Sequence, residues 1–114
     1  MRLDQTDRKQ GIFFFFGGFA ELLLGRAEVS IDLFRKSLER NPGYGATQLF
    51  LMAALSLAGR PGEAAQTAAA FRTQHPDFPA NAFQQLWLSR SSSPTYRAQV
   101  QPVFEKICSI GIAA

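Results

Sequence analysis

Two turn signals recur along the 114-residue chain at one fixed distance. A Gly-Arg pair begins at Gly25 and again at Gly59, and a proline follows a polar residue at Pro42 and again at Pro76. Both separations are 34 residues (59 − 25 and 76 − 42). A repeat of this length is typical of small units that cannot bury their apolar face alone and therefore stack on one another. We expect two consecutive copies of one helix–turn–helix unit.

The segments between these turns have the periodicity of amphipathic helices. One face of each carries apolar or small residues three or four positions apart: Ile31, Phe34 and Leu38 within 28–40, and Ala64, Ala68 and Phe71 within 62–74. Gly25 is suited to end the helix before it, and Pro42 cannot continue the helix that follows. We expect Phe34 and Leu38 to be buried between the first two helices.

The stretch GIFFFFGGFAELLLGR (11–26) is the most apolar part of the chain. Its apolar span, residues 12–24, is shorter than the roughly 20 residues of a membrane-spanning helix, and it contains Glu21. A secretory leader would end in a small-x-small cleavage site, which is absent here. We predict a core helix from about Gly11 to Leu24 that is covered on more than one side, with Gly17 and Gly18 letting a neighbouring helix approach closely.

Beyond the second unit the repeat decays. DFPANAFQQLWLSR (77–90) places Phe83 and Trp87 four residues apart and predicts the first helix of a partial third unit. A last helix then begins with Ser93 as N-cap and Pro94 at the first helical position. One stripe of this helix carries its large apolar residues: Tyr96, Val100, Val103, Phe104 and Ile107. Pro102 predicts a kink there or two abutting helices.

The composition is that of one globular domain. Hydrophobic residues make up 46% of the chain, charged residues 18%, and the net charge is +3. The single cysteine, Cys108, excludes an internal disulfide and suits a reducing compartment. We expect a cytoplasmic protein without a membrane span.

The 34-residue period and its motif residues resemble the tetratricopeptide repeat, whose pattern is W-x2-L-G-x2-Y, then A-x3-F, then P. The first copy holds Phe14, Gly17, Gly18, Glu21, Ser30, Phe34 and Pro42 at these places. The second copy holds Gln48, Leu51, Met52, Leu55, Ala64, Ala68 and Pro76. Met52 is the clearest departure, because a small residue at that place lets two helices approach closely.

Across residues 11–112 the chain resembles the carboxy-terminal repeats of bacterial signalling proteins that carry adenylate/guanylate cyclase domains or winged-helix regulators. The resemblance implies an all-α, TPR-like superhelix with five to six helices and no strand. It also implies a polar arm (1–10) and one domain (11–110), divided into repeats at about 11–44 and 45–78 and a partial repeat with a capping helix at 79–110. It implies no cyclase activity, because the catalytic aspartates and their sheet have no counterpart here.

No residue pattern points to catalysis, a cofactor or a metal. His75, the single histidine, stands at a repeat boundary and indicates a helix end, and Cys108 is expected to pack as a small hydrophobe. GRPGE (59–63) lacks the Lys-Ser/Thr of a phosphate loop. The basic residues of 35–40 are interspersed with acids, which is typical of a solvated face.

We therefore expect a non-catalytic protein-interaction or regulatory module. In tetratricopeptide modules the first helix of each pair lines a concave groove; here those places hold Ile12, Phe15, Phe19 and Leu22, then Ala46, Leu49, Ala53 and Ser56, then Phe83 and Trp87. An apolar groove of this kind needs an occupant. The candidates are the chain's own last helix, a second copy in a homodimer, or a partner helix. Two alternatives stay open: a nucleic-acid-associated regulator and a peripheral membrane-binding module that uses the Phe-rich helix.

Overall fold

The computed structural model describes residues 5–41, 45–76 and 93–109, and nearly all of them are helical. The helices are α1 (Gln5–Leu23), α2 (Ala27–Arg40), α3 (Gly45–Leu57), α4 (Pro61–Gln74) and α6 (Pro94–Ser109). No strand occurs within these ranges, which confirms the all-α class. The predicted helix that contains Phe83 and Trp87 lies outside the described residues.

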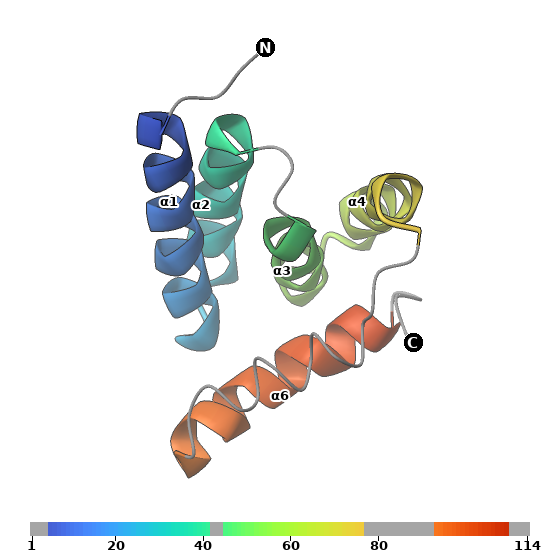
Figure 1. Cartoon of the computed structure of the whole chain (residues 1–114). Coiled ribbons are helices and arrows are strands. Elements are labelled where there is room, and N and C mark those ends of the chain that lie inside the picture. Colours follow the sequence, from blue (N-terminus) through green and yellow to red (C-terminus); the bar gives the residue numbers. More distant parts are fainter. Residues whose placement is uncertain (1–4, 42–44, 77–92, 110–114) are drawn as a thin grey trace.

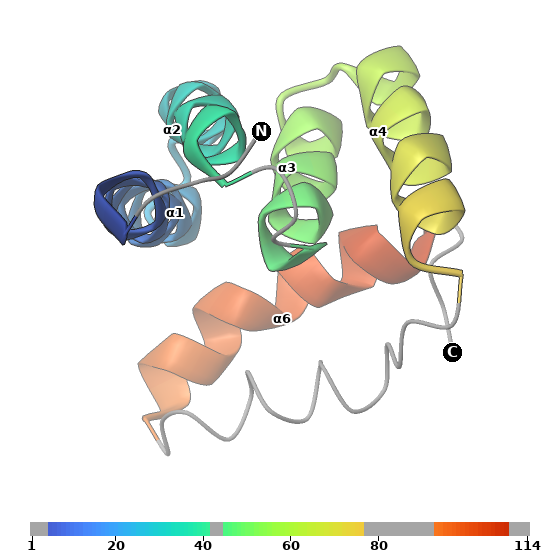
Figure 2. The ribbon, with the colours of Figure 1, turned by 45° about the horizontal axis from the view of Figure 1, so that its top comes forward.

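The helices form two antiparallel hairpins and one crossing helix (Figure 1). α1 pairs with α2, and α3 pairs with α4. α3 also packs against α2 and α6, so it is the element that joins the hairpins to the last helix. In Figure 2, α6 runs across the hairpins and lies against α3.

The two hairpins repeat each other at a spacing of 34 residues along the backbone. α2 and α4 begin 34 residues apart (61 − 27) and also end 34 residues apart (74 − 40). The turns are the same: Gly25 has φ +80° and Gly59 has φ +78°, a left-handed conformation that glycine adopts without strain. The Arg26 N–H donates to the Glu21 carbonyl at 2.9 Å, and Arg60 donates to Leu55 at 2.8 Å. The predicted turns are confirmed.

The second helices of the hairpins end alike as well. The Asn41 N–H donates to the Ser37 carbonyl at 2.8 Å, and the His75 N–H donates to Phe71 at 2.8 Å. His75 is therefore the C-cap of α4, as predicted. The buried stripes of α2 and α4 also confirm their patterns, with Leu38 only partly buried: Ile31, Phe34, Ala64, Ala68 and Phe71 are buried.

A cluster of phenylalanine rings forms the centre of the core. Phe50 of α3 lies 5.8 Å from Phe15, 5.0 Å from Phe19 and 6.4 Å from Phe34, measured between ring centroids. Every residue of α3 from Ala46 to Leu55 is buried. This explains why α3 has no polar face: its whole circumference is covered by neighbouring helices.

α1 differs from the prediction in two ways. It begins at Gln5 instead of about Gly11, because residues 5–10 are polar but contain no glycine or proline that would stop a helix. It is also not covered on several sides: Phe15 is buried, whereas Phe13 is 75% exposed and Phe16 is 49% exposed. Only one side of the phenylalanine run faces the core.

The close approach predicted at the paired glycines is confirmed at Gly18. A Cβ on Gly18 would lie 2.8 Å from the Phe34 ring, so no other residue fits there without moving that ring. Of the two outcomes predicted at Pro102, two abutting helices are not found, since α6 continues through Pro102 as a single helix; the predicted kink stays a prediction.

Candidate interaction surfaces

The residues predicted to line a groove are largely inside the molecule. Phe15, Phe19, Leu22, Leu49 and Ala53 are all buried in one core cluster. Ala46 is buried too, Ser56 is half-buried, and Ile12 is 44% exposed. Phe83 and Trp87 lie outside the described residues. The structure thus brings most of these side chains together, but as core.

α6 supplies part of the cover over these residues. Val100, Phe104 and Ile107 are buried in the same cluster. The Phe104 ring lies 5.9 Å from Phe50, and the Tyr96 ring lies 6.5 Å from Phe19. We call the side of the hairpins that carries Phe19 and Phe50 their inner side; it packs against the chain's own last helix.

A second apolar surface lies on α1, on the side turned away from the core. We call it the outer face of α1 and define it by five residues: Ile12, Phe13, Phe16, Ala20 and Leu24. Phe13, Phe16 and Ala20 are spaced three or four residues apart along α1, Ile12 lies four residues before Phe16, and Leu24 directly follows the last residue of the helix. Leu24 is 60% exposed, and Ala20 is exposed as well. A contiguous exposed patch of large apolar side chains is a feature of interaction sites.

The residues of the second hairpin that are equivalent to the outer face of α1 are buried. Adding 34 to the residues of the outer face gives Ala46, Thr47, Phe50, Ala54 and Ala58 on the second hairpin. The first four of these are at most 7% exposed, and Ala58 is half-buried. The first hairpin covers two of them, since Phe34 of α2 stacks on Phe50 and the Ser37 and Thr47 hydroxyls are 3.4 Å apart. Phe104 of α6 adds to the cover of Phe50. The outer face of α1 is thus the place where a preceding hairpin would pack.

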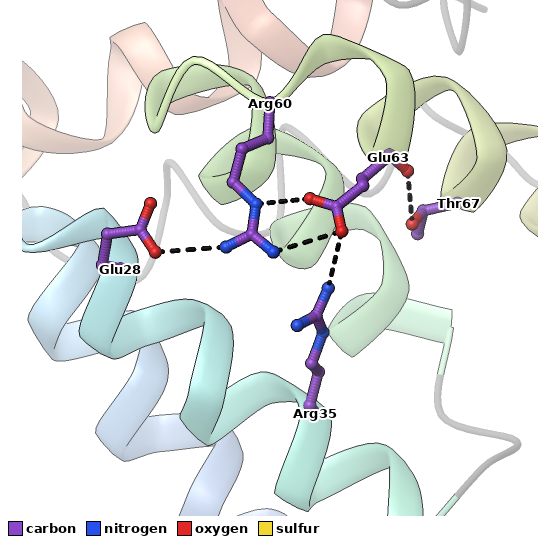
Figure 3. A network of polar contacts seen from close by, with 5 residues as sticks. All are labelled: Glu28, Arg35, Arg60, Glu63 and Thr67. Carbon is purple, nitrogen blue, oxygen red and sulfur yellow. Dashed lines mark hydrogen bonds and ion pairs between the residues drawn. The ribbon is translucent and has the colours of Figure 1, made fainter.

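A charged network joins the two hairpins at their surface (Figure 3). The Arg60 guanidinium donates to both carboxylate oxygens of Glu63, with Nη2 3.1 Å from Oε1, and its Nη1 donates to Glu28 at 3.1 Å. Arg35 reaches Glu63 at 3.5 Å. Since Glu28 and Arg35 belong to α2 and Glu63 to α4, the network links second helix to second helix.

Electrostatics within this network follow from its hydrogen bonds. The Arg60 guanidinium donates to the Glu63 carboxylate, which lowers the pKa of Glu63 below its ordinary value. The same hydrogen bond raises the pKa of Arg60. The four side chains keep between 32% and 67% of their surface in solvent, so the network stabilises the contact between the two helices only weakly.

Among the residues that the structure describes, the Gln48 Oε1 and the His75 Nε2 are buried side-chain atoms without a hydrogen-bond partner. Gln48 uses its other amide atom, Nε2, to donate to the Gln74 side chain at 3.1 Å. The His75 ring lies beside Phe71, tilted by 35°, with ring centroids 5.0 Å apart. Both lie where the start of α3 meets the end of α4, since a Cβ on Gly45 would be 3.4 Å from the His75 Nε2.

The remaining candidate residues do not converge on a site. The side chain of Cys108 lies outside the described part of the chain. In the ranges that the structure describes, no group of three or more His, Cys, Asp or Glu is placed to hold a metal ion. Of the basic face of α2, Arg35 pairs with Glu63 and the Lys36 ammonium lies 5.9 Å from the centre of the Phe14 ring.

No described helix combines the length and the apolar character that crossing a membrane requires. Comparison with known protein families, with curated proteins and with solved structures gives no match for this chain. A functional proposal therefore has to be built on the chain's own residues. The sequence analysis did not identify the outer face of α1. The signal was present, because the 34-residue offset matches Phe13 and Phe16 to Thr47 and Phe50 of the second hairpin.

Proposed function

We propose that this chain is a non-catalytic protein-interaction module made of two tetratricopeptide-like hairpins, and that the outer face of α1 is its docking surface for a helical partner. The observation that carries the proposal is the difference between Phe16 and Phe50. They occupy equivalent places in the two hairpins, yet Phe16 is 49% exposed, whereas Phe50 is fully buried between the rings of the preceding hairpin and Phe104 of α6. The outer face thus has the composition of a helix–helix interface without its second helix.

The inner side of the hairpins supports the same choice of docking surface. A peptide groove on that side would need Phe19 and Phe50 to be accessible, and Tyr96 and Phe104 of α6 pack against them. These contacts support the chain's own last helix as the occupant of the predicted groove. A partner that binds there would have to displace α6, whereas the outer face of α1 is already free of α6.

The 34-residue period supports kinship with the repeat regions of bacterial cyclase-type or winged-helix signalling proteins, as the motif residues also suggest. In that setting the module would hold a cytoplasmic partner by surface complementarity. A peripheral membrane role is the second candidate, and one observation favours it: Lys9 is exposed on α1 one turn before Phe13. The burial of the equivalent α3 residues under a helix favours the protein partner.

A duplication tests whether the outer face accepts a helical hairpin. Residues 1–44 are joined to residues 11–114, which adds one unit of 34 residues (44 − 10) and keeps the period. The added α2 should then cover the original outer face as α2 covers α3, so we expect a higher urea midpoint with one cooperative transition. The control carries Phe16→Glu in the original α1 only. An added unit that unfolds separately, or a midpoint that the control shares, would overturn the proposal.

A further inference from the structure

The outer face of α1 has the features of a surface that pairs with itself. We propose that two copies of this chain associate by packing their α1 helices antiparallel through this face, in a symmetric contact. The inference rests on the proposed function, because it names the helical partner as a second copy. It commits to one occupant of the face, and other proteins or a membrane become outcomes of the test.

The first argument compares the aromatic neighbours of Phe16 with those of its counterpart in the second hairpin. Its counterpart Phe50 is surrounded by phenylalanine rings, with Phe15, Phe19 and Phe34 all within 6.4 Å between centroids. Aromatic pairs at such distances are favourable beyond the area that they bury. In the part of the chain that the structure describes, the exposed phenylalanine rings are Phe13 and Phe16 themselves. Phe16 itself has one ring neighbour, Phe15 at 5.2 Å between centroids, so a second copy offers Phe16 further ring partners of the kind that Phe50 has inside the molecule.

The second argument is the order of large and small residues along the helix. Phe13 precedes Phe16 by three residues, and Ala20 follows it by four. In an antiparallel pair with its two-fold axis beside Phe16, the Phe13 ring of one copy faces the small Ala20 of the other, and the reverse. In a two-fold symmetric contact each pairing occurs once on either side of the axis, so the single pairing of Phe13 with Ala20 packs both sides of the interface.

The third argument is area. The exposed parts of Ile12, Phe13, Phe16 and Leu24 amount to on the order of 400 Å² in each copy, taking about 150–250 Å² for a complete aromatic side chain. Pairing two copies would then bury about 1,000 Å² in total with the neighbouring atoms, which is near the lower limit for a specific interface. We therefore expect a dimer that forms at micromolar concentrations or above.

Sedimentation equilibrium of the full chain over a wide concentration range tests the pairing. The average mass of the parent should rise from 12.6 kDa toward twice that value. Phe16→Glu should stay monomeric, because it places a charge at the two-fold axis. The matched control is Leu57→Glu, which changes an apolar residue of similar exposure, 42%, that lies on α3 outside the face. This control should dimerise like the parent, and both variants should keep the parent's circular dichroism spectrum.

A second variant separates the specific pairing from general stickiness. Ala20→Phe enlarges the small residue that faces Phe13, so the specific contact should weaken by at least tenfold in Kd. General hydrophobic association would strengthen instead, since the variant exposes more apolar surface. A parent that remains monomeric, a Phe16→Glu variant that still dimerises, or an Ala20→Phe variant that associates more tightly would each overturn the inference.

The protein with the duplicated hairpin distinguishes a failure of the dimer inference from a failure of the proposed helix-docking function. If the added hairpin raises the midpoint while the parent stays monomeric, the face accepts a helical partner that is not a second copy. If both experiments fail, the face is not a helix-docking surface. Cosedimentation with vesicles of phosphatidylserine and phosphatidylcholine covers the remaining case: a monomeric parent that binds them, and loses binding with Phe16→Glu, would assign the face to a membrane.

Discussion

The second helices and the turns of the two hairpins repeat at a spacing of 34 residues, but the large residue at the contact between the two helices comes from a different helix in each hairpin. In the first hairpin the small residue is on α1 and the large one on α2, where Gly18 receives the ring of Phe34. The equivalent pair in the second hairpin is Met52 and Ala68, and both are fully buried. Large and small have changed places between the helices. The repeat conserves the volume at this contact, not the residue at each position.

This comparison explains the departure that Met52 makes from the tetratricopeptide pattern. Taken alone, a large residue at that place should keep the two helices of the second hairpin apart. Ala68 compensates, because it leaves on α4 the space that Phe34 takes on α2. A motif scored one position at a time treats both positions of such an exchange as irregular, although the pair is well packed.

The largest effect is expected where the first hairpin contributes its large residue. Phe34→Ala should destabilise the protein by about 3–5 kcal/mol, because it removes a fully buried ring and leaves a cavity against Gly18. The equivalent change in the second hairpin, Ala68→Gly, should cost only about 1 kcal/mol, mostly from lost helix propensity. Urea denaturation of both variants measures the difference. Equal midpoints for the two would mean that the hairpins are not packed as described.

Exchanging the pair should recover much of that loss. Gly18→Met alone should destabilise by about 1–3 kcal/mol or more, since a Cβ at this place would already lie 2.8 Å from the Phe34 ring. Gly18→Met combined with Phe34→Ala recreates the pair of the second hairpin and should be more stable than the sum of the two single changes by about 1–3 kcal/mol. A double-mutant cycle in urea gives this coupling. Additive effects would refute the exchange of volumes.

A buried hydroxyl distinguishes the two hairpins on a smaller scale. Ser37 donates to the Gly11 carbonyl at 2.7 Å and lies against Thr47, whereas its equivalent, Phe71, has no hydroxyl. Ser37→Ala should cost about 0.5–1.5 kcal/mol, because it removes one buried hydrogen bond while the Gly11 carbonyl keeps its acceptor role within α1. Ser30→Ala is the control, since Ser30 donates to Ala27 within its own helix. We expect the control to lose less stability in the same urea titration.

The smallest effect concerns the charged network between the hairpins. Hydrogen bonding from Arg60 lowers the pKa of Glu63 in the folded state, so its stabilising contribution is present above the ordinary glutamate range and is lost as the pH falls through the lowered pKa. Glu63→Gln should therefore lower the thermal midpoint slightly at neutral pH and match the parent in strong acid. Glu105→Gln, an exposed change on α6 outside the network, is the control. A difference that persists unchanged in acid would assign the effect of Glu63 to packing.

The sequence by itself determined the features that depend on local chemistry. Gly25 and Gly59 set the left-handed turns, because glycine adopts that conformation without strain, and the 34-residue spacing of these turns defines two like hairpins. The spacing of Ile31 and Phe34 selected the buried side of α2 for the same kind of reason, since a period near 3.6 places them on one face.

Only the tertiary structure decided which side of an all-apolar helix is buried. α1 and α3 are both apolar around most of their circumference, so no polar face in the sequence orients either of them. α3 lies among α1, α2, α4 and α6 and buries Phe50, whereas α1 contacts its neighbours α2, α3 and α6 on the side of Phe15 and Phe19 and leaves Phe13 and Phe16 exposed. Burial depends on which helices are present to cover a face. That reason accounts both for the six predicted groove residues that are buried in the core and for the exposed outer face of α1.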